Sequence, residues 1–130
     1  MADTIHHEIA IAASPARIYE ALLNAEQFAQ RTGGAPTTID RASGGAFSCF
    51  GGHVTGRNVE LAQDRLIVQA WRAKTWPEGV YSIVRFEFVP DGNGTRLMFD
   101  HTGFPDGTRA HLDTGWHENY WATLKKQLEP

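Results

Sequence analysis

The sequence has a single cysteine, no strong excess of either charge and no long hydrophobic run. Cys49 is alone among 130 residues, so an internal disulfide is excluded and the fold depends on packing, which fits a reducing, cytoplasmic setting. The formal charge is −3 and Lys and Arg do not cluster, so nucleic-acid binding is not expected. We also expect no membrane span, which needs ~18 consecutive apolar residues, and no signal peptide.

The composition is that of an ordinary globular protein, with 42% hydrophobic and 21% charged residues. Neither an internal repeat nor a Pro/Ser-rich linker divides the chain. We therefore expect one domain over residues 1–130, long enough to bury a substantial core.

The first forty residues predict a strand over 4–12 followed by two short helices. Ser14 suits a helix N-cap and Pro15 the first helical position. Apolar residues then recur at helical spacing. A second helix over 25–30 should end before Gly33 and Gly34.

The middle of the chain predicts antiparallel strands joined by short turns. The pair Gly51-Gly52 and the run 91–94 (Asp-Gly-Asn-Gly) are turn signals. Apolar and polar residues alternate between them, as in a sheet with one buried face. The expected strands cover 37–41, 45–50, 53–61, 65–74, 80–89 and 95–102.

The chain ends in a predicted helix over about 108–128. Its inner stripe should consist of Leu112, Trp116, Tyr120 with Asn119, Thr123 or Leu124, and Leu128. Short connections between strands imply antiparallel neighbours, and the long helix should cover the concave face of the sheet. The fold class is therefore α+β, with about six or seven strands.

Aromatic side chains dominate the inward faces of the predicted sheet and helix. A helix crossing a curved sheet either fills the space between them with a core or leaves a cavity, and the sequence leaves both open. If a cavity is present, apolar walls with a few polar groups are typical of a ligand site. The predicted pocket residues are Phe47, Cys49, Trp71, Phe86, Phe99, His101, Trp116 and Tyr120.

His101 is the inward polar residue of most interest. It is either a hydrogen-bonded core histidine or the polar group of the pocket. A nucleophilic pair of His101 with Cys49 would need hydrogen-bond contact, which nothing in the sequence indicates. The other histidines lack metal-ligand spacing, since His6 and His7 should face opposite ways, so no metal and no cofactor are expected.

Several segments together resemble a known family. The opening 13–22 resembles START-like (SRPBCC, helix-grip) domains. More specifically, the chain from about 9 to 128 resembles the C-terminal domain of the activator of heat-shock-protein-90 ATPase. The segments that carry this likeness are Gly44–Phe47, Gly52–Gly56, Trp71–Gly79, Gly94–Leu97, and Gly115-Trp116 before Tyr120-Trp121.

The resemblance implies a helix-grip fold, in which a curved antiparallel sheet holds a long C-terminal helix and two small helices close one end. Full activators also have an N-terminal domain that contacts the chaperone, for which we expect no room in 130 residues. Other relatives bind lipids, hormones or polyketides in the cavity, and some are cyclases or dehydratases.

Three functions follow as hypotheses. The first is binding of a small apolar molecule in the cavity. The second is a chaperone-interacting regulatory role, in which Trp76, expected to be partly exposed beside a turn, would anchor the partner. The third is a cyclase-like or dehydratase-like enzyme. We favour a non-enzymatic role, because His101 is the single inward acid/base candidate and has no visible catalytic partner.

Overall fold

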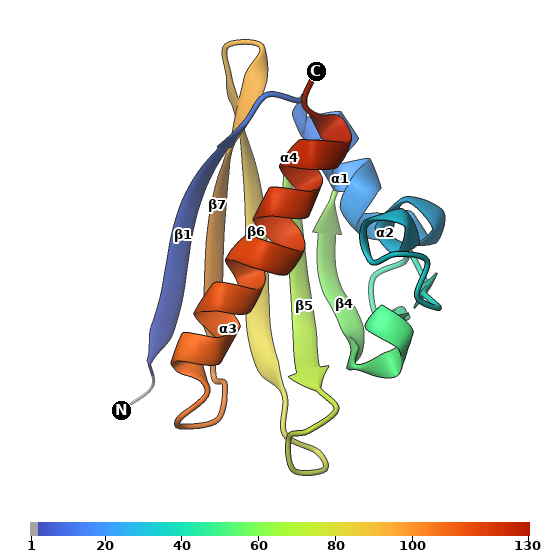
Figure 1. Ribbon diagram of the computed structural model, residues 1–130, viewed down its shortest axis with the longest axis vertical. Helices are drawn as coiled ribbons and strands as arrows, with labels where there is room; N and C mark the ends of the chain where they lie inside the picture. Colours follow the sequence, from blue (N-terminus) through green and yellow to red (C-terminus); the bar gives the residue numbers. More distant parts are fainter. Residues whose placement is uncertain (1–2) are drawn as a thin grey trace.

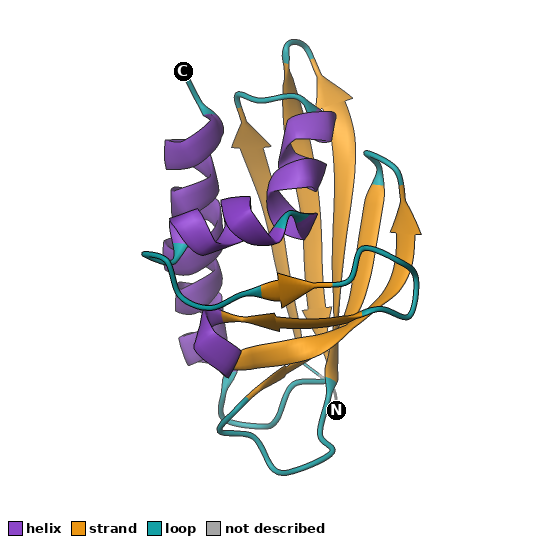
Figure 2. Ribbon diagram, turned by 90° about the vertical axis from the view of Figure 1, so that its right-hand side faces the viewer, coloured by secondary structure: helices purple, strands orange, loops and turns teal. Residues whose placement is uncertain are grey.

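A curved antiparallel sheet holds one long helix against its concave face in the computed structural model, which describes residues 3–130 (Figure 1). The seven strands follow the order β1-β7-β6-β5-β4-β3-β2. The helices lie on one side of the sheet (Figure 2), so the predicted α+β class and helix-grip architecture are confirmed. The strands are β1 (Thr4–Ile11), β2 (Thr38–Ile39), β3 (Ala46–Cys49), β4 (Val54–Ala62), β5 (Leu66–Ala73), β6 (Ser82–Asp91) and β7 (Gly94–Thr102).

Two short helices follow β1 and close one end of the sheet. Helix α1 (Pro15–Leu23) begins at the predicted cap, where the Arg17 amide donates to the Ser14 hydroxyl over 3.3 Å. Asn24 ends this helix and caps α2 (Ala25–Arg31) by accepting from the Gln27 amide over 3.0 Å. A single 3₁₀ turn, η1 (Phe50–Gly52), connects β3 to β4.

The C-terminal helix is continuous but not uniform. It consists of α3 (Arg109–Gly115), a π-helical segment η2 (Trp116–Trp121) and α4 (Ala122–Leu128). The amide of Ala122 donates to the carbonyl of His117, five residues back, as in a π-helix. The sequence predicts the extent of this helix but not its π segment, and its inner stripe omits Trp121, which is 2% exposed.

Two buried indoles of η2 are hydrogen-bonded to two histidines of the sheet. Trp116 Nε1 donates to Nδ1 of His101 in β7 over 3.0 Å, and Trp121 Nε1 donates to Nδ1 of His7 in β1 over 2.8 Å. In a regular α-helix, side chains five residues apart diverge by about 140°. The wider π turn brings both indoles to the same side, where their rings stack 5.9 Å apart.

The bonding of His101 fixes its protonation. An indole nitrogen can only donate, so Nδ1 accepts and the proton of the neutral ring lies on Nε2. That nitrogen lies 2.7 Å from the Ser82 hydroxyl, which in turn donates to the carbonyl of Trp71 over 3.1 Å. Burial lowers the pKa of His101 to about 3, so the ring is neutral at physiological pH. Of the two predicted alternatives, this geometry is that of a hydrogen-bonded core histidine.

No helix in residues 3–130 combines the length and apolar character needed to cross a membrane.

The neutral state of His101 predicts a specific pH dependence of stability. In the unfolded chain this histidine takes up a proton near pH 6.5, whereas in the folded protein it stays neutral until about pH 3. Protons therefore bind preferentially to the unfolded chain between these values, and stability falls as the pH falls. From pH 7 to pH 5, wild type should lose about 2 kcal/mol more unfolding free energy than His101→Gln, measured by urea denaturation.

His6→Gln serves as the control, because the exposed His6 has its pKa raised, chiefly by its hydrogen bond to Glu8. Its contribution is present at low pH and is lost as the pH rises, so this variant should not reduce the loss in acid. An unchanged pH dependence in His101→Gln would contradict the bonding described here.

Candidate functional site

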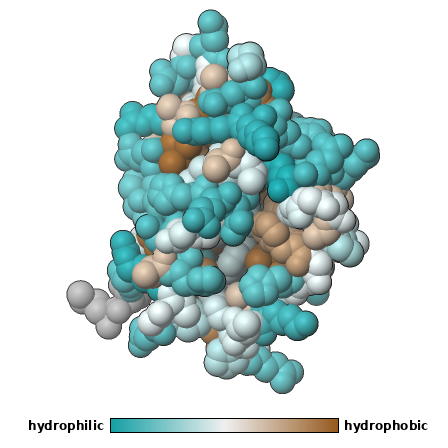
Figure 3. Space-filling view, in the orientation of Figure 1, coloured by the Kyte–Doolittle hydropathy of each residue, from teal (hydrophilic) through white to brown (hydrophobic). Residues whose placement is uncertain are grey.

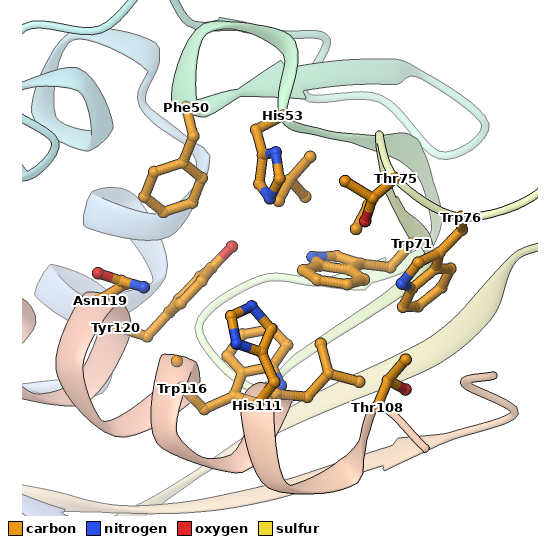
Figure 4. Close-up of a pocket in the computed structure, with 14 residues that line it drawn as sticks. Phe50, His53, Trp71, Thr75, Trp76, Thr108, His111, Trp116, Asn119 and Tyr120 are labelled. Atoms are coloured by element: carbon orange, nitrogen blue, oxygen red, sulfur yellow. The ribbon is translucent and has the colours of Figure 1, made fainter. Parts of the chain in front are cut away.

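A cavity of about 470 Å³ lies between the C-terminal helix and the β4–β5 side of the sheet. Figure 4 shows side chains entering it from η1 and β4, from β5 and the loop after it, and from the helix. Figure 3 shows hydrophobic residues gathered to the lower right of the centre on this face of the molecule. The lining residues are Phe50, His53, Val54, Trp71, Ala73, Thr75, Trp76, Thr108, His111, Leu112, Gly115, Trp116, Asn119 and Tyr120.

The predicted pocket residues divide into three groups. Trp71, Trp116 and Tyr120 line this cavity. Phe99 and His101 are fully buried and do not line this cavity. Phe99 packs instead against the indoles of Trp116 and Trp121. The third group consists of Phe47, Cys49 and Phe86, which together with Tyr120 line a much smaller hollow of about 10 Å³.

Trp76 lines the cavity instead of facing solvent. Its side chain is 7% exposed, and its ring centroid lies 5.5 Å from that of Trp71. The loop that carries it is held by Arg72, whose guanidinium donates to the carbonyls of Trp76 and Pro77 over 3.1 and 2.9 Å. The partial exposure that we expected for this indole is therefore not found.

Several lining residues were missed by the sequence analysis. On the helix, the missed residues are Thr108, His111 and Gly115, which recur every three or four residues and form a second row that ends at Asn119 of the predicted stripe. That spacing was available in the sequence. The positions of His53 and Thr75 depend on how η1 and the loop after β5 fold back, which no local pattern indicates.

The cavity contains an unsatisfied buried donor. Trp71 is 5% exposed, and its Nε1 makes no hydrogen bond of good geometry in the part of the chain that the structure describes. Its one polar neighbour of note is the Tyr120 hydroxyl, whose pKa is raised by burial and lowered, to a smaller extent, by this indole. Figure 4 shows the nitrogen edge of this indole turned toward the hydroxyl group of Tyr120. Burial raises the pKa of that hydroxyl far above its usual range, so it remains protonated.

The cavity lining has no carboxylate, ammonium or guanidinium group. The residues around it include no Asp, Glu, Lys or Arg. Its polar groups are hydroxyls, the amide of Asn119, the imidazoles of His53 and His111, and the indoles. Both histidines extend toward the interior from opposite walls (Figure 4). The site can therefore hold an apolar molecule and offer it both hydrogen-bond donors and acceptors.

A nucleophilic pair of Cys49 with His101 is not supported by the geometry. Both ring nitrogens of His101 bind other groups, Trp116 and Ser82. Burial raises the pKa of the Cys49 thiol to about 12, so the thiol is protonated and weakly nucleophilic.

A group with metal-ligand atoms lies outside the cavity, formed by His7, Asp113 and His117. The sequence analysis did not place these residues together, because they come from β1, α3 and η2. His7 Nε2 lies 2.6 Å from an Asp113 carboxylate oxygen, while its Nδ1 accepts from Trp121. A metal at Nε2 would have to displace the proton shared with Asp113, so hydrogen bonding already accounts for this group.

Comparisons with known proteins agree with this architecture. Residues 12–129 match the family model described as Activator of Hsp90 ATPase homolog 1-like protein. A mouse relative, activator of 90 kDa heat shock protein ATPase homolog 2, is 30% identical over 108 residues, 83% of this chain and 33% of the relative. The homologue from Dictyostelium discoideum is 32% identical over 86% of this chain and 29% of its own length. The chain thus spans about a third of these curated relatives.

Solved structures of similar length share the fold. An Hsp90 activator from Plasmodium falciparum superposes with a TM-score of 0.87 at 26% identity, covering 97% of this chain and 94% of that one. The Aha1 dimer from Colwellia psychrerythraea gives 0.82 at 22% identity, covering 98% and 96%. With the family match over 118 of 130 residues (12 to 129), the chain belongs to the family of activator of Hsp90 ATPase homolog 1-like proteins.

Proposed function

We propose that this domain binds an Hsp90-class chaperone and regulates its ATPase. The observation that carries the proposal is the family match over residues 12–129. Further support is that the Plasmodium protein, described as an Hsp90 activator, has nearly the same length and fold. A domain of this size therefore has a precedent in a protein named for that role.

The outer face of the sheet offers a surface for such a partner. Tyr81 and Ile83 lie two residues apart on the outer side of the β6 region and are 52% and 44% exposed. The guanidinium of Arg72 lies 5.7 Å from the Tyr81 ring centroid. Aromatic and arginine side chains are enriched in protein interfaces, and exposed apolar neighbours favour contact with a partner.

The test measures binding and ATPase rate with an Hsp90-class chaperone from the same organism. Wild type should bind and change the rate, whereas the double variant Tyr81→Ser/Ile83→Ser should bind at least about tenfold more weakly, as expected for interface anchors. Val89→Ser is the matched control. Val89 is on the same strand and face, 41% exposed and six residues from Ile83, and its loss should change binding less than about twofold.

Two outcomes would contradict this proposal. Absence of wild-type binding and of any rate change would refute the chaperone function itself. Full binding by the double variant, with wild type active, would refute the surface while leaving the function intact.

A second candidate function is binding of a small apolar molecule in the main cavity, and Gly115 favours it. This glycine lies within the helix with ordinary helical φ of −60° and ψ of −40°, and an added β-carbon would meet only the Asn119 amide at 3.7 Å. Glycine costs a helix about 1 kcal/mol relative to alanine. Neither the backbone conformation nor a close neighbour requires a glycine at this position. The absence of a side chain instead leaves open space in the cavity wall.

The test is native mass spectrometry of the protein freshly purified from its own host. Wild type should carry an adduct that disappears on denaturation. Gly115→Met, which extends a side chain from the cavity wall, should lose the adduct, whereas Val89→Met on the outer face should keep it. An adduct that survives Gly115→Met would place the ligand elsewhere and contradict this function.

A further inference from the structure

We propose that the main cavity selects neutral molecules bearing a carbonyl oxygen, which accepts hydrogen bonds from the Trp71 indole and the Tyr120 hydroxyl. This inference rests on the second function proposed above, ligand binding in that cavity. It adds the chemical class of the ligand and the position of its polar atom.

The first step of the argument is the unsatisfied indole. A buried donor without a partner loses its hydration without compensation, so native proteins rarely retain one without a role. Trp71 Nε1 is such a donor. By contrast, the buried indole nitrogens of Trp116 and Trp121 each donate to a histidine. An indole nitrogen has no acceptor capacity, so its missing partner must be an acceptor.

The second step is the convergence of two donors. The nitrogen edge of Trp71 faces the nearby hydroxyl of Tyr120 at the cavity wall (Figure 4), without forming a hydrogen bond of good geometry to it. Because burial keeps that hydroxyl protonated, it can donate as well. One carbonyl oxygen has two lone pairs and can therefore accept from both donors at once.

The third step is the absence of counter-charge. None of the cavity side chains is Lys, Arg, Asp or Glu. A carboxylate carried to the depth of Trp71 would lose its hydration without an ion-pair partner, which is costly. The ligand group that fits is therefore neutral, as in a ketone, an ester or an amide.

The fourth step is the apolar surroundings of these donors. The rings of Trp116 and Trp76 lie 5.4 and 5.5 Å from that of Trp71, and Phe50 lies 5.8 Å from Tyr120. Flat aromatic walls favour a planar or ring-containing apolar body. A volume of about 470 Å³ lies within the range of ligand sites, roughly 300–1,000 Å³.

The experiment compares three probes of nearly the same shape: 2-acetylnaphthalene, which has the carbonyl, 2-ethylnaphthalene, which lacks it, and 2-naphthoate, which carries a charge. Tryptophan fluorescence titration of the full chain at pH 7.5 gives their affinities. The ketone should bind about tenfold tighter than the hydrocarbon, as expected when a buried donor gains its partner. The carboxylate should bind more weakly than the ketone.

The same probes can be followed at the indole nitrogens without any substitution. The four tryptophans give four indole N–H signals in a ¹⁵N–¹H correlation spectrum. The ketone should move the Trp71 signal downfield, whereas the histidine-bonded signals of Trp116 and Trp121 should move less. Assignment requires only the single variants Trp71→Phe and Trp76→Phe.

The same two variants also test whether the preference for the ketone over the hydrocarbon depends on Trp71. Trp71→Phe should reduce the ketone affinity to that of the hydrocarbon, while Trp76→Phe, which alters another lining indole, should keep the ketone preference. Equal affinities of ketone and hydrocarbon, or an unmoved Trp71 signal, would overturn the inference but leave ligand binding in place. If none of the probes binds, this inference is overturned, and the native mass spectrum decides the second function separately: an adduct lost in Gly115→Met keeps that function, and no adduct refutes it.

Discussion

The position of the C-terminal helix on the sheet depends on the hydrogen bonds that two buried indole N–H groups make. Trp116 and Trp121 are each 2% exposed, so an unbonded N–H group in either would carry a desolvation cost of about 1–3 kcal/mol. Two histidines on neighbouring strands, His101 and His7, provide the acceptors. Nδ1 of each histidine therefore carries no proton, and the Nε2–H group of each donates a hydrogen bond to a further oxygen, of Ser82 for His101 and of Asp113 for His7. The helix is thereby fixed to β1 and β7 by polar bonds as well as by packing.

This attachment decides where open space remains. Both bonds draw the helix to the β1–β7 side of the sheet, and the π segment supplies the extra residue per turn that lets both indoles reach it. On the opposite side, toward β4 and β5, the wall is built from Gly115 on the helix and from rings that meet edge to face. The same bonds that make His101 part of the core therefore remove it from the cavity, where Trp71 is left as the unsatisfied donor.

The sequence predicted most of the fold because local patterns determine it. Alternation along β6 and β7, the Ser14–Pro15 helix start and the turn at 91–94 each describe short segments, and the structure reproduces them. The π segment was not predictable in this way, since it depends on tertiary hydrogen bonds to two histidines that lie 15 and 114 residues away from their indoles. A signal for His7 was nevertheless present, because alternation in β1 places it on the face of Ile5 and Ile11, which are buried.

The candidate site was harder to predict because inward alternation does not distinguish core from cavity wall. Phe99 and Trp71 both point inward, yet Phe99 is covered by two indoles and Trp71 faces open space. The difference arises from where the helix lies across the sheet, a tertiary property. One loop also joins the inner and outer surfaces, because Arg72 binds the carbonyls of its residues, Trp76 lines the cavity and Tyr81 reaches the outside. Substitutions within this loop would disturb both surfaces, whereas Gly115 and Ile83 each lie on one surface alone and so distinguish the two functions.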